Sequence, residues 1–128
     1  MPVVVDSSAL VELLIQSERA PAVIQALGTT EWVAPDVVNP EVLSALRRME
    51  RGGLAAGRVA KAVDDLLDAP LRRYPTLPLM PEAWTLRADV TTTDACYVVL
   101  ARILHCPLVT GDLRLSRAPG LGVPLVTV

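Results

Sequence analysis

The sequence predicts an α/β fold in which a central, mostly parallel sheet is covered by helices on both faces, giving a three-layer α/β/α sandwich. Two observations support this prediction. Short apolar runs alternate along the chain with longer segments of helical spacing. The short runs are apolar at every position, as at residues 2–5 and 107–109, which is typical of parallel strands covered on both faces. We expect a single domain over residues 1–128.

The first part of the chain is expected to form a strand, two helices, a strand and a helix. These segments are residues 2–5, 9–16, 20–27 and 31–34, followed by a helix that begins at Asp36 or Asn39. The start of that helix is ambiguous because of Pro40, but Gly52 and Gly53 mark a clear end. Gly28 closes the second helix, and Pro35 closes the second strand.

The rest of the chain is expected to form a helix, a connector, two helices and two strands. These segments are residues 54–67, 71–79, 81–88, 94–105, 107–112 and 124–128. Pro75 and Pro78 interrupt the connector, which is either strand-like or irregular. Pro81 is suited to the first turn of a helix, and Pro107 prevents the long helix before it from continuing.

Composition and charge limit the possible partners. The chain is 52% hydrophobic and contains no Phe, so its core must be built from Val, Leu, Ile and Ala. The net charge of -2 gives no overall attraction to nucleic acid. A role on RNA or DNA therefore requires a local basic patch or metal ions.

The cysteines and the hydropathy pattern favour a cytoplasmic protein. Cys96 and Cys106 are ten residues apart, and on one helix they would lie roughly 15 Å apart, beyond the reach of a disulfide. We expect both thiols to stay reduced. The sequence has no apolar run of membrane-spanning length and no basic stretch before its first apolar segment, so neither a membrane span nor a signal peptide is expected.

Four acidic residues are expected to meet at one edge of the sheet. Asp6 and Asp112 each follow a predicted strand, whereas Glu41 and Asp94 lie near the starts of helices. In an open parallel sheet the functional crevice lies beyond the carboxyl ends of the strands. Helices that cross back over the sheet begin at that same edge, so all four carboxylates are expected to converge there.

Each acid also has a purely structural explanation. Asp6 and Asp112 suit loop or helix-cap positions, Glu41 favours a helix start, and Asp94, three residues after Thr91, suits a capping box. Four carboxylates about 4 Å apart would nevertheless repel one another and raise their pKa values. A hard divalent cation would relieve this repulsion, and oxygen-only ligands favour Mg²⁺ or Mn²⁺ over zinc. His105, the sole histidine, has no partner at metal-ligand spacing and is expected to be structural.

Three stretches carry a resemblance to a known family. They are VVVDSSALVELL, APDVVNPEVLSALRR and TTTDACYVVLARILHCPLVTGDLRLSRA. Together they resemble a PIN domain, and the short chain resembles the VapC-type toxins of toxin–antitoxin pairs. The resemblance covers nearly the whole chain and is weakest at residues 52–90. The TTTDA start of the long helix departs from family members that carry Tyr just before the third acid.

The resemblance implies a Mg²⁺-dependent endoribonuclease, with Mn²⁺ as a possible substitute. The four family acids match Asp6, Glu41, Asp94 and Asp112. Asp6, Asp94 and Asp112 would be the main metal ligands, and Glu41 a ligand or the base for the attacking water. Ser7 and Thr110 match small hydroxyl residues that would support these acids.

The resemblance also implies partners. The substrate would be RNA, with Arg114 and Arg117 as candidates for binding its phosphates, whereas Arg47, Arg48 and Arg51 are expected to lie farther from the acids. Such toxins usually form homodimers and are inhibited by a small VapB-like antitoxin in a hetero-oligomer. The antitoxin would pack in an apolar groove among early helices, for which residues 10–16, 21–27 and 55–67 offer apolar faces.

Other functions compete with this interpretation. A haloacid-dehalogenase-like phosphatase needs a second Asp two residues after the first, where this chain has Ser8. A receiver-like signalling domain needs a late Lys beside its acids, but the only lysine is Lys61. The serious rival is a PIN-like module that keeps the acids but only binds RNA or protein.

Overall fold

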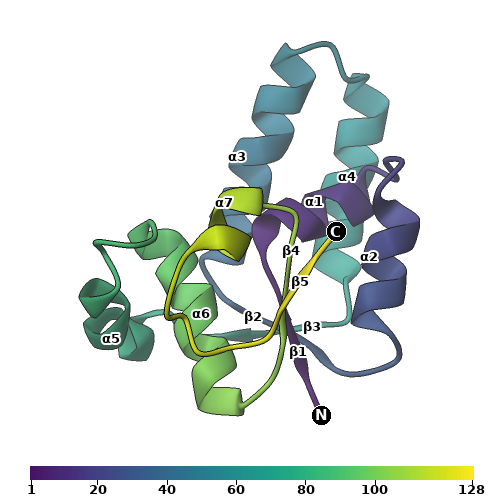
Figure 1. Ribbon diagram of the computed structural model, residues 1–128. Coiled ribbons are helices and arrows are strands. Elements are labelled where there is room, and N and C mark those ends of the chain that lie inside the picture. Colours follow the sequence, from purple (N-terminus) through teal and green to yellow (C-terminus); the bar gives the residue numbers. More distant parts are fainter.

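A computed structural model of the protein describes residues 1–128 and contains one five-stranded sheet (Figure 1). The strands are β1 (Val3–Val5), β2 (Trp32–Pro35), β3 (Leu71–Tyr74), β4 (Leu108–Thr110) and β5 (Leu125–Thr127). Their order is β3-β2-β1-β4-β5, and every neighbouring pair is parallel. The sheet was expected to be mostly parallel and is entirely so. Strand order reverses between β1 and β4, and such a switch point is where open α/β sheets bind ligands.

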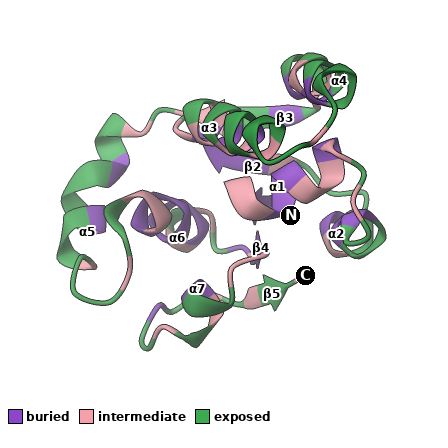
Figure 2. Ribbon diagram, turned by 90° about the horizontal axis from the view of Figure 1, so that it is seen from above, coloured by how far each residue is buried: buried purple, intermediate pink, exposed green.

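Helices cover both faces of the sheet, which confirms the three-layer α/β/α arrangement (Figure 2). The helices are α1 (Ser7–Leu14), α2 (Ala20–Leu27), α3 (Val38–Arg51), α4 (Ala56–Asp68), the 3-10 helix η1 (Leu77–Leu79), α5 (Met80–Thr85), α6 (Thr92–Leu104) and α7 (Leu113–Arg117). Helices α1 and α2 lie on one face, while α6 packs on the other with α5 outside it. The hairpin of α3 and α4 extends beyond the sheet (Figure 1).

One cluster of buried residues joins the sheet to the helices on both faces. As the composition predicts, this core is mainly aliphatic, and Tyr97 is its largest fully buried side chain. Helix α6 is enclosed on several sides because every residue from 95 to 101 is buried. The start of α6, which carries Asp94, is therefore held firmly against the sheet.

Several boundaries differ from the sequence-based expectation. The first helix begins at Ser7 rather than at residue 9, because the side chain of Asp6 caps it. The expected helix over residues 81–88 ends at Thr85. The connector over residues 71–79 contains both strand β3 and the 3-10 helix η1. Helix α7 was not expected at all.

The two cysteines do not share a helix as the distance argument assumed. Cys96 lies in α6, whereas Cys106 follows the end of that helix at His105. Both thiols are buried and free. His105 ends α6 in the left-handed conformation, and its backbone N–H reaches the carbonyls of Ala101 and Arg102, so its role in the fold is that of a helix cap. No helix combines the length and the apolar character needed to cross a membrane.

Candidate active site

The four predicted acids lie at one edge of the sheet, around the point where the strand order reverses. Asp6 directly follows β1, and Asp112 comes two residues after β4. Glu41 and Asp94 lie in the first turns of α3 and α6. The expected placement at the carboxyl ends of the strands is therefore found.

Asp6 is held by hydrogen bonds at both of its carboxylate oxygens. Oδ1 accepts from the Ser8 hydroxyl at 2.6 Å and from the backbone N–H of Ala9 at 3.0 Å. Oδ2 accepts from the hydroxyl of Thr110. Asp6 is only 3% exposed, and this burial raises the pKa of its carboxyl group despite the three hydrogen bonds.

The same hydroxyl groups fix the loop that carries Asp112. The N–H of Gly111 donates to Ser8 Oγ, and the N–H of Asp112 donates to Thr110 Oγ1, each at 2.9 Å. A Cβ at position 111 would lie 3.3 Å from Ser8 Oγ, so glycine allows this close approach. The tips of β1 and β4 are thus tied together through side chains.

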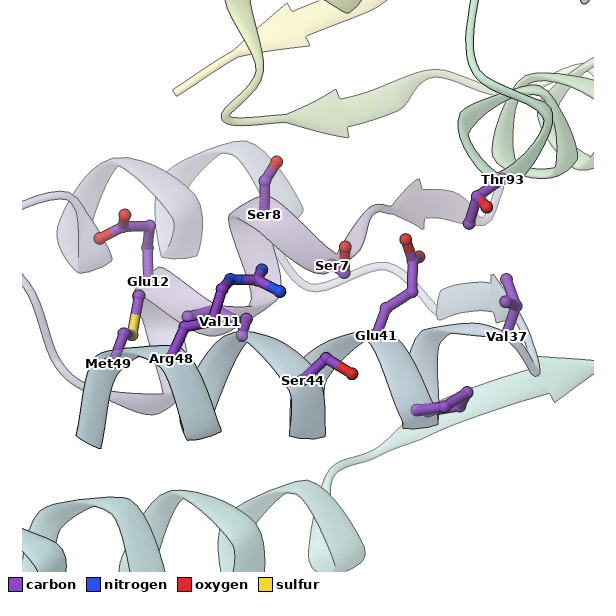
Figure 3. Close-up of a pocket in the computed structure, with 12 residues that line it drawn as sticks. Ser7, Ser8, Val11, Glu12, Val37, Glu41, Ser44, Arg48, Met49 and Thr93 are labelled. Atoms are coloured by element: carbon purple, nitrogen blue, oxygen red, sulfur yellow. The ribbon is translucent and has the colours of Figure 1, made fainter. Parts of the chain in front are cut away.

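Glu41 is held by a tyrosine from the opposite side of the site. The hydroxyl of Tyr97, on α6, donates a hydrogen bond to Glu41 Oε1. Burial raises the pKa of Glu41, as do the charges of Asp94 and Asp6, while Tyr97 and the adjacent Ser7 hydroxyl act in the opposite direction. Figure 3 shows Ser7 and Glu41 facing each other. Of the four acids, Glu41 is therefore the one whose pKa the Ser7 hydroxyl lowers.

Asp94 and Asp112 form the other side of the site. Burial and the charge of Asp112 raise the pKa of Asp94, while the Thr91 hydroxyl and Arg114 partly offset them. The Thr91 hydroxyl also accepts from the N–H of Asp94 at 3.1 Å, which caps α6. Asp112 caps α7 by accepting from the N–H of Arg114 at 2.8 Å. The capping explanations for Asp6 and Asp112 are thus correct, and they coexist with the acidic cluster.

The chemistry of these side chains fits a hard divalent cation. Oxygen is the only donor type present, and Asp6, Glu41 and Asp94 have pKa values raised by burial and by neighbouring carboxylates. A bound cation would oppose both effects. No three of the His, Cys, Asp or Glu side chains are already placed so that they could hold one ion together. The acids lie at one edge of the sheet, but their side chains are not arranged as a preformed metal site.

Two grooves lead away from the acids. The first, of about 530 Å³, lies between α1 and α3 and includes Glu41 (Figure 3). The second, of about 350 Å³, includes Asp94, Asp112, Arg87 and Arg114. Arg114 therefore lies beside the acids, as its predicted contact with RNA requires. Arg117 is exposed and does not line either groove.

Sequence reasoning did not assign Ser8 or Tyr97 to the site. Tyr97 lies three residues after Asp94 and so shares its side of α6, a spacing that could have indicated it. Its contact with Glu41 joins residues 56 positions apart. The contact of Ser8 with Gly111 spans 103 positions and leaves no local pattern in the sequence.

Comparison with known proteins identifies the family of this arrangement. The family model described as "PIN domain" matches residues 3–121. The chain belongs to the PIN domain family. Among relatives of this PIN domain, Ribonuclease VapC3 of Mycobacterium tuberculosis is 43% identical over 118 residues, which cover 91% of this chain and 86% of the relative. The VapC ribonuclease Mb0985 of Mycobacterium bovis is 36% identical over 129 residues, covering 98% of each chain.

Solved structures show the same PIN fold at lower identity. VapC20 of Mycobacterium tuberculosis, described as a sarcin-ricin loop cleaving toxin, has a TM-score of 0.68 and 18% identity over 89% of this chain and 92% of its own. VapBC2 of Rickettsia felis, solved with a DNA fragment from its promoter, has a TM-score of 0.68 and 14% identity over 99% of this chain and 98% of its own. These likenesses support the PIN fold of the whole chain.

Proposed function

We propose that this PIN domain is an endoribonuclease that hydrolyses RNA phosphodiester bonds with Mg²⁺ or Mn²⁺, and that it is the toxin of a VapBC-type toxin–antitoxin pair. The observation that carries the proposal is the gathering of Asp6, Glu41, Asp94 and Asp112 at one sheet edge. It is supported by the 43% identity to Ribonuclease VapC3.

In this proposal each acidic side chain of the site has a role in hydrolysis. When bound, the cation supplies positive charge against the phosphate and lowers the pKa of the attacking water. Asp6, Asp94 and Asp112 would hold it, with Asp6 fixed in place by Ser8 and Thr110. Tyr97 would orient the Glu41 carboxylate through Oε1, and Oε2 would bind the ion or accept a proton from the water.

The second groove suits the phosphate backbone of RNA. Arg87 is held with its guanidinium 4.5 Å from the ring centroid of Trp84, and Arg114 is largely exposed beside Asp112. Both can donate hydrogen bonds to phosphate oxygens next to the acids. Arg114 is therefore proposed to bind RNA. Arg117 lies on the same short helix and would meet the strand farther out.

Partner proteins are part of the proposal. A VapB-like antitoxin would bind the toxin in a hetero-oligomer, and the toxin itself would form a homodimer. Most apolar residues of α1, α2 and α4 are used in the core, but Ile24 and Leu67 remain exposed. Leu77, Met80 and Trp84 are also exposed, and they line an apolar groove of about 710 Å³. These side chains supply apolar area for protein contacts.

A cleavage assay tests the enzymatic proposal. The purified chain is incubated with total RNA in Mg²⁺, in Mn²⁺ and in EDTA, and the 5′ ends of the products are mapped. We expect cleavage at defined positions with either metal and none with the chelator. Tight RNA binding without turnover under all three conditions would instead identify a non-catalytic binding module.

A further inference from the structure

The groove between α1 and α3 contains a single cationic side chain, Arg48. Its remaining lining has four hydroxyl side chains, two carboxylates and five apolar residues. The lining residues include Ser7, Ser8, Ser44, Thr93, Glu12 and Glu41. Arg48 can pair with a negative charge on a ligand, and the hydroxyl side chains can hydrogen-bond to hydroxyl groups on the same ligand. Negative charge and hydroxyl groups are the features of a sugar–phosphate backbone.

Arg48 and Glu41 face the same groove because of their spacing on α3. They are seven residues apart, which is about two helical turns and a rise of about 10 Å. Figure 3 shows both side chains projecting from the same side of the helix, with Ser44 between them. Arg48 was expected to lie farther from the acids than Arg114 and Arg117, and it is two helical turns from Glu41. It nevertheless lines the same groove as Glu41.

The guanidinium of Arg48 is free to bind an anion. It takes part in no ion pair and no side-chain hydrogen bond in the structure, although Glu12 lines the same groove. The carboxylate of Glu12 instead accepts a hydrogen bond from Ser17. An unpaired guanidinium in the groove that also contains Glu41 is a suitable donor for a phosphate on the strand that the acids act upon.

We propose that Arg48 binds a phosphate of the RNA neighbouring the one that is cleaved. The strand would then run from the α1–α3 groove, past the acids, to the second groove at Arg87 and Arg114. This inference rests on the proposed ribonuclease function and adds to it the path of the substrate. It assigns Arg48 a role in binding the strand rather than in the chemical step.

The chain offers a closely matched control for Arg48. Arg47 is its neighbour on α3, is also exposed and carries the same charge, but it does not line the groove. Arg48→Gln and Arg47→Gln therefore change net charge identically and differ only in the direction of the lost side chain. Arg48→Lys keeps the charge and removes the fork of donors.

The probe is a synthetic oligoribonucleotide that spans a mapped cleavage position, labelled with fluorescein. Its binding is measured by anisotropy in EDTA over a series of salt concentrations, and its cleavage is measured in Mg²⁺. We expect Arg48→Gln to weaken binding and raise KM by roughly tenfold at low salt, with little change in kcat. The slope of log K against log salt should become shallower by about 0.7. Arg47→Gln should behave like wild type, and Arg48→Lys should recover part of the loss.

The outcomes separate this inference from the proposed function. Equal binding, KM and salt slope for Arg48→Gln and Arg47→Gln would overturn the inference while leaving the ribonuclease intact. An equal loss in both variants would also overturn it, because general charge rather than the groove would then explain the effect. If wild type fails to cleave any RNA, the proposed function fails. The binding comparison in EDTA, with total transfer RNA as the probe, would then still show whether Arg48 binds RNA at all.

Discussion

Thr110 at the tip of β4 donates a hydrogen bond from its hydroxyl to Oδ2 of Asp6 at the tip of β1. This contact joins the two strands between which the strand order reverses. It also leaves Asp6 with a fixed orientation even though burial raises the pKa of its carboxyl group. A carboxylate that is costly to bury and yet held in place is typical of a functional group rather than a stabilising one.

Replacing Asp6 should separate activity from stability. We expect Asp6→Asn to lower divalent-dependent RNA cleavage by at least about 100-fold, because a charged metal ligand is lost. The free energy of unfolding at pH 7 should not fall, since the substitution removes a buried charge. Cleavage rates and urea denaturation provide the measurements. Asp64→Asn, at an exposed position on α4, is the control. Wild-type cleavage by a carefully purified Asp6→Asn protein would contradict the assignment of Asp6 as a metal ligand.

The metal-free protein should lose stability as the pH rises from mildly acidic to neutral. The pKa values of Asp6, Glu41 and Asp94 are raised in the folded state above their ordinary values of 3.8, 4.5 and 3.8. Protonation of these carboxyl groups therefore stabilises the folded state. This stabilisation is fully present when the pH is below the ordinary pKa values, and it is lost as the pH rises through the raised pKa values of the folded state. Thermal unfolding in EDTA between pH 4.5 and pH 8 measures the effect. It should be smaller in Asp6→Asn, and an identical pH profile in the two proteins would count against the coupling.

Divalent cations should restore that stability at pH 7. At a free Mg²⁺ or Mn²⁺ concentration ten times the dissociation constant, the expected gain in unfolding free energy is about 1.4 kcal/mol. Differential scanning fluorimetry with and without EDTA detects this as a reversible rise in Tm. Asp94→Asn should reduce the rise, whereas Asp64→Asn should keep it. A rise of the same size in both variants would place the ion elsewhere.

The hydrogen bond from Tyr97 to Glu41 should matter for both activity and stability. Tyr97→Phe keeps the buried ring but leaves Glu41 Oε1 without its donor. We expect kcat to fall by roughly tenfold and the free energy of unfolding by about 1–2 kcal/mol. Tyr74→Phe is the matched control, because the Tyr74 hydroxyl forms no hydrogen bond and lies on the edge strand β3. Wild-type kcat in Tyr97→Phe would show that Glu41 is oriented without it.

Ser8 should prove more important than its exposed neighbours in the same groove. Ser8→Ala removes a hydrogen bond to Asp6 and leaves the N–H of Gly111 without an acceptor. The expected cost is about 1–2 kcal/mol of unfolding free energy, together with weaker binding of Mn²⁺. Isothermal titration calorimetry and urea denaturation measure the two effects. Ser44→Ala is the control, since Ser44 lines the groove and forms no hydrogen bond, and equal behaviour of the two variants would contradict this role.

The sequence was sufficient for the layers of the fold because β1, β2 and most of β4 and β5 are continuous apolar runs. It was less informative about β3, where Arg72 and Arg73 interrupt the apolar pattern. That strand lies at the edge of the sheet, so one of these side chains can reach solvent. Helix α7 escaped prediction because it has only five residues and depends on Asp112 as its cap.

The candidate site was predictable where it depends on topology and unpredictable where it depends on side-chain packing. Asp6 and Asp112 could be placed because each follows an apolar strand, and Glu41 and Asp94 because helices begin at the same edge. Which hydroxyl contacts which carboxylate is decided by packing between distant segments. Ser8, whose contact with Gly111 needs both strand tips in place, could therefore be found only from the structure.

Because β1 is the central strand of the sheet, the two sides of the site should differ in their free energy of local unfolding. The backbone of β1 is bonded to segments on both sides, through Val3 to Glu31 and through Val4 to Pro107. Amide hydrogens around Asp6 should therefore exchange with solvent only when the whole domain unfolds. The segment after Asp112 packs against the edge strand β5 and should open at a lower free energy. A long polymer that enters the site would thus contact a rigid side at Asp6 and a more flexible side at Asp112. Any change in the shape of the site on binding should therefore occur on the side of Asp112.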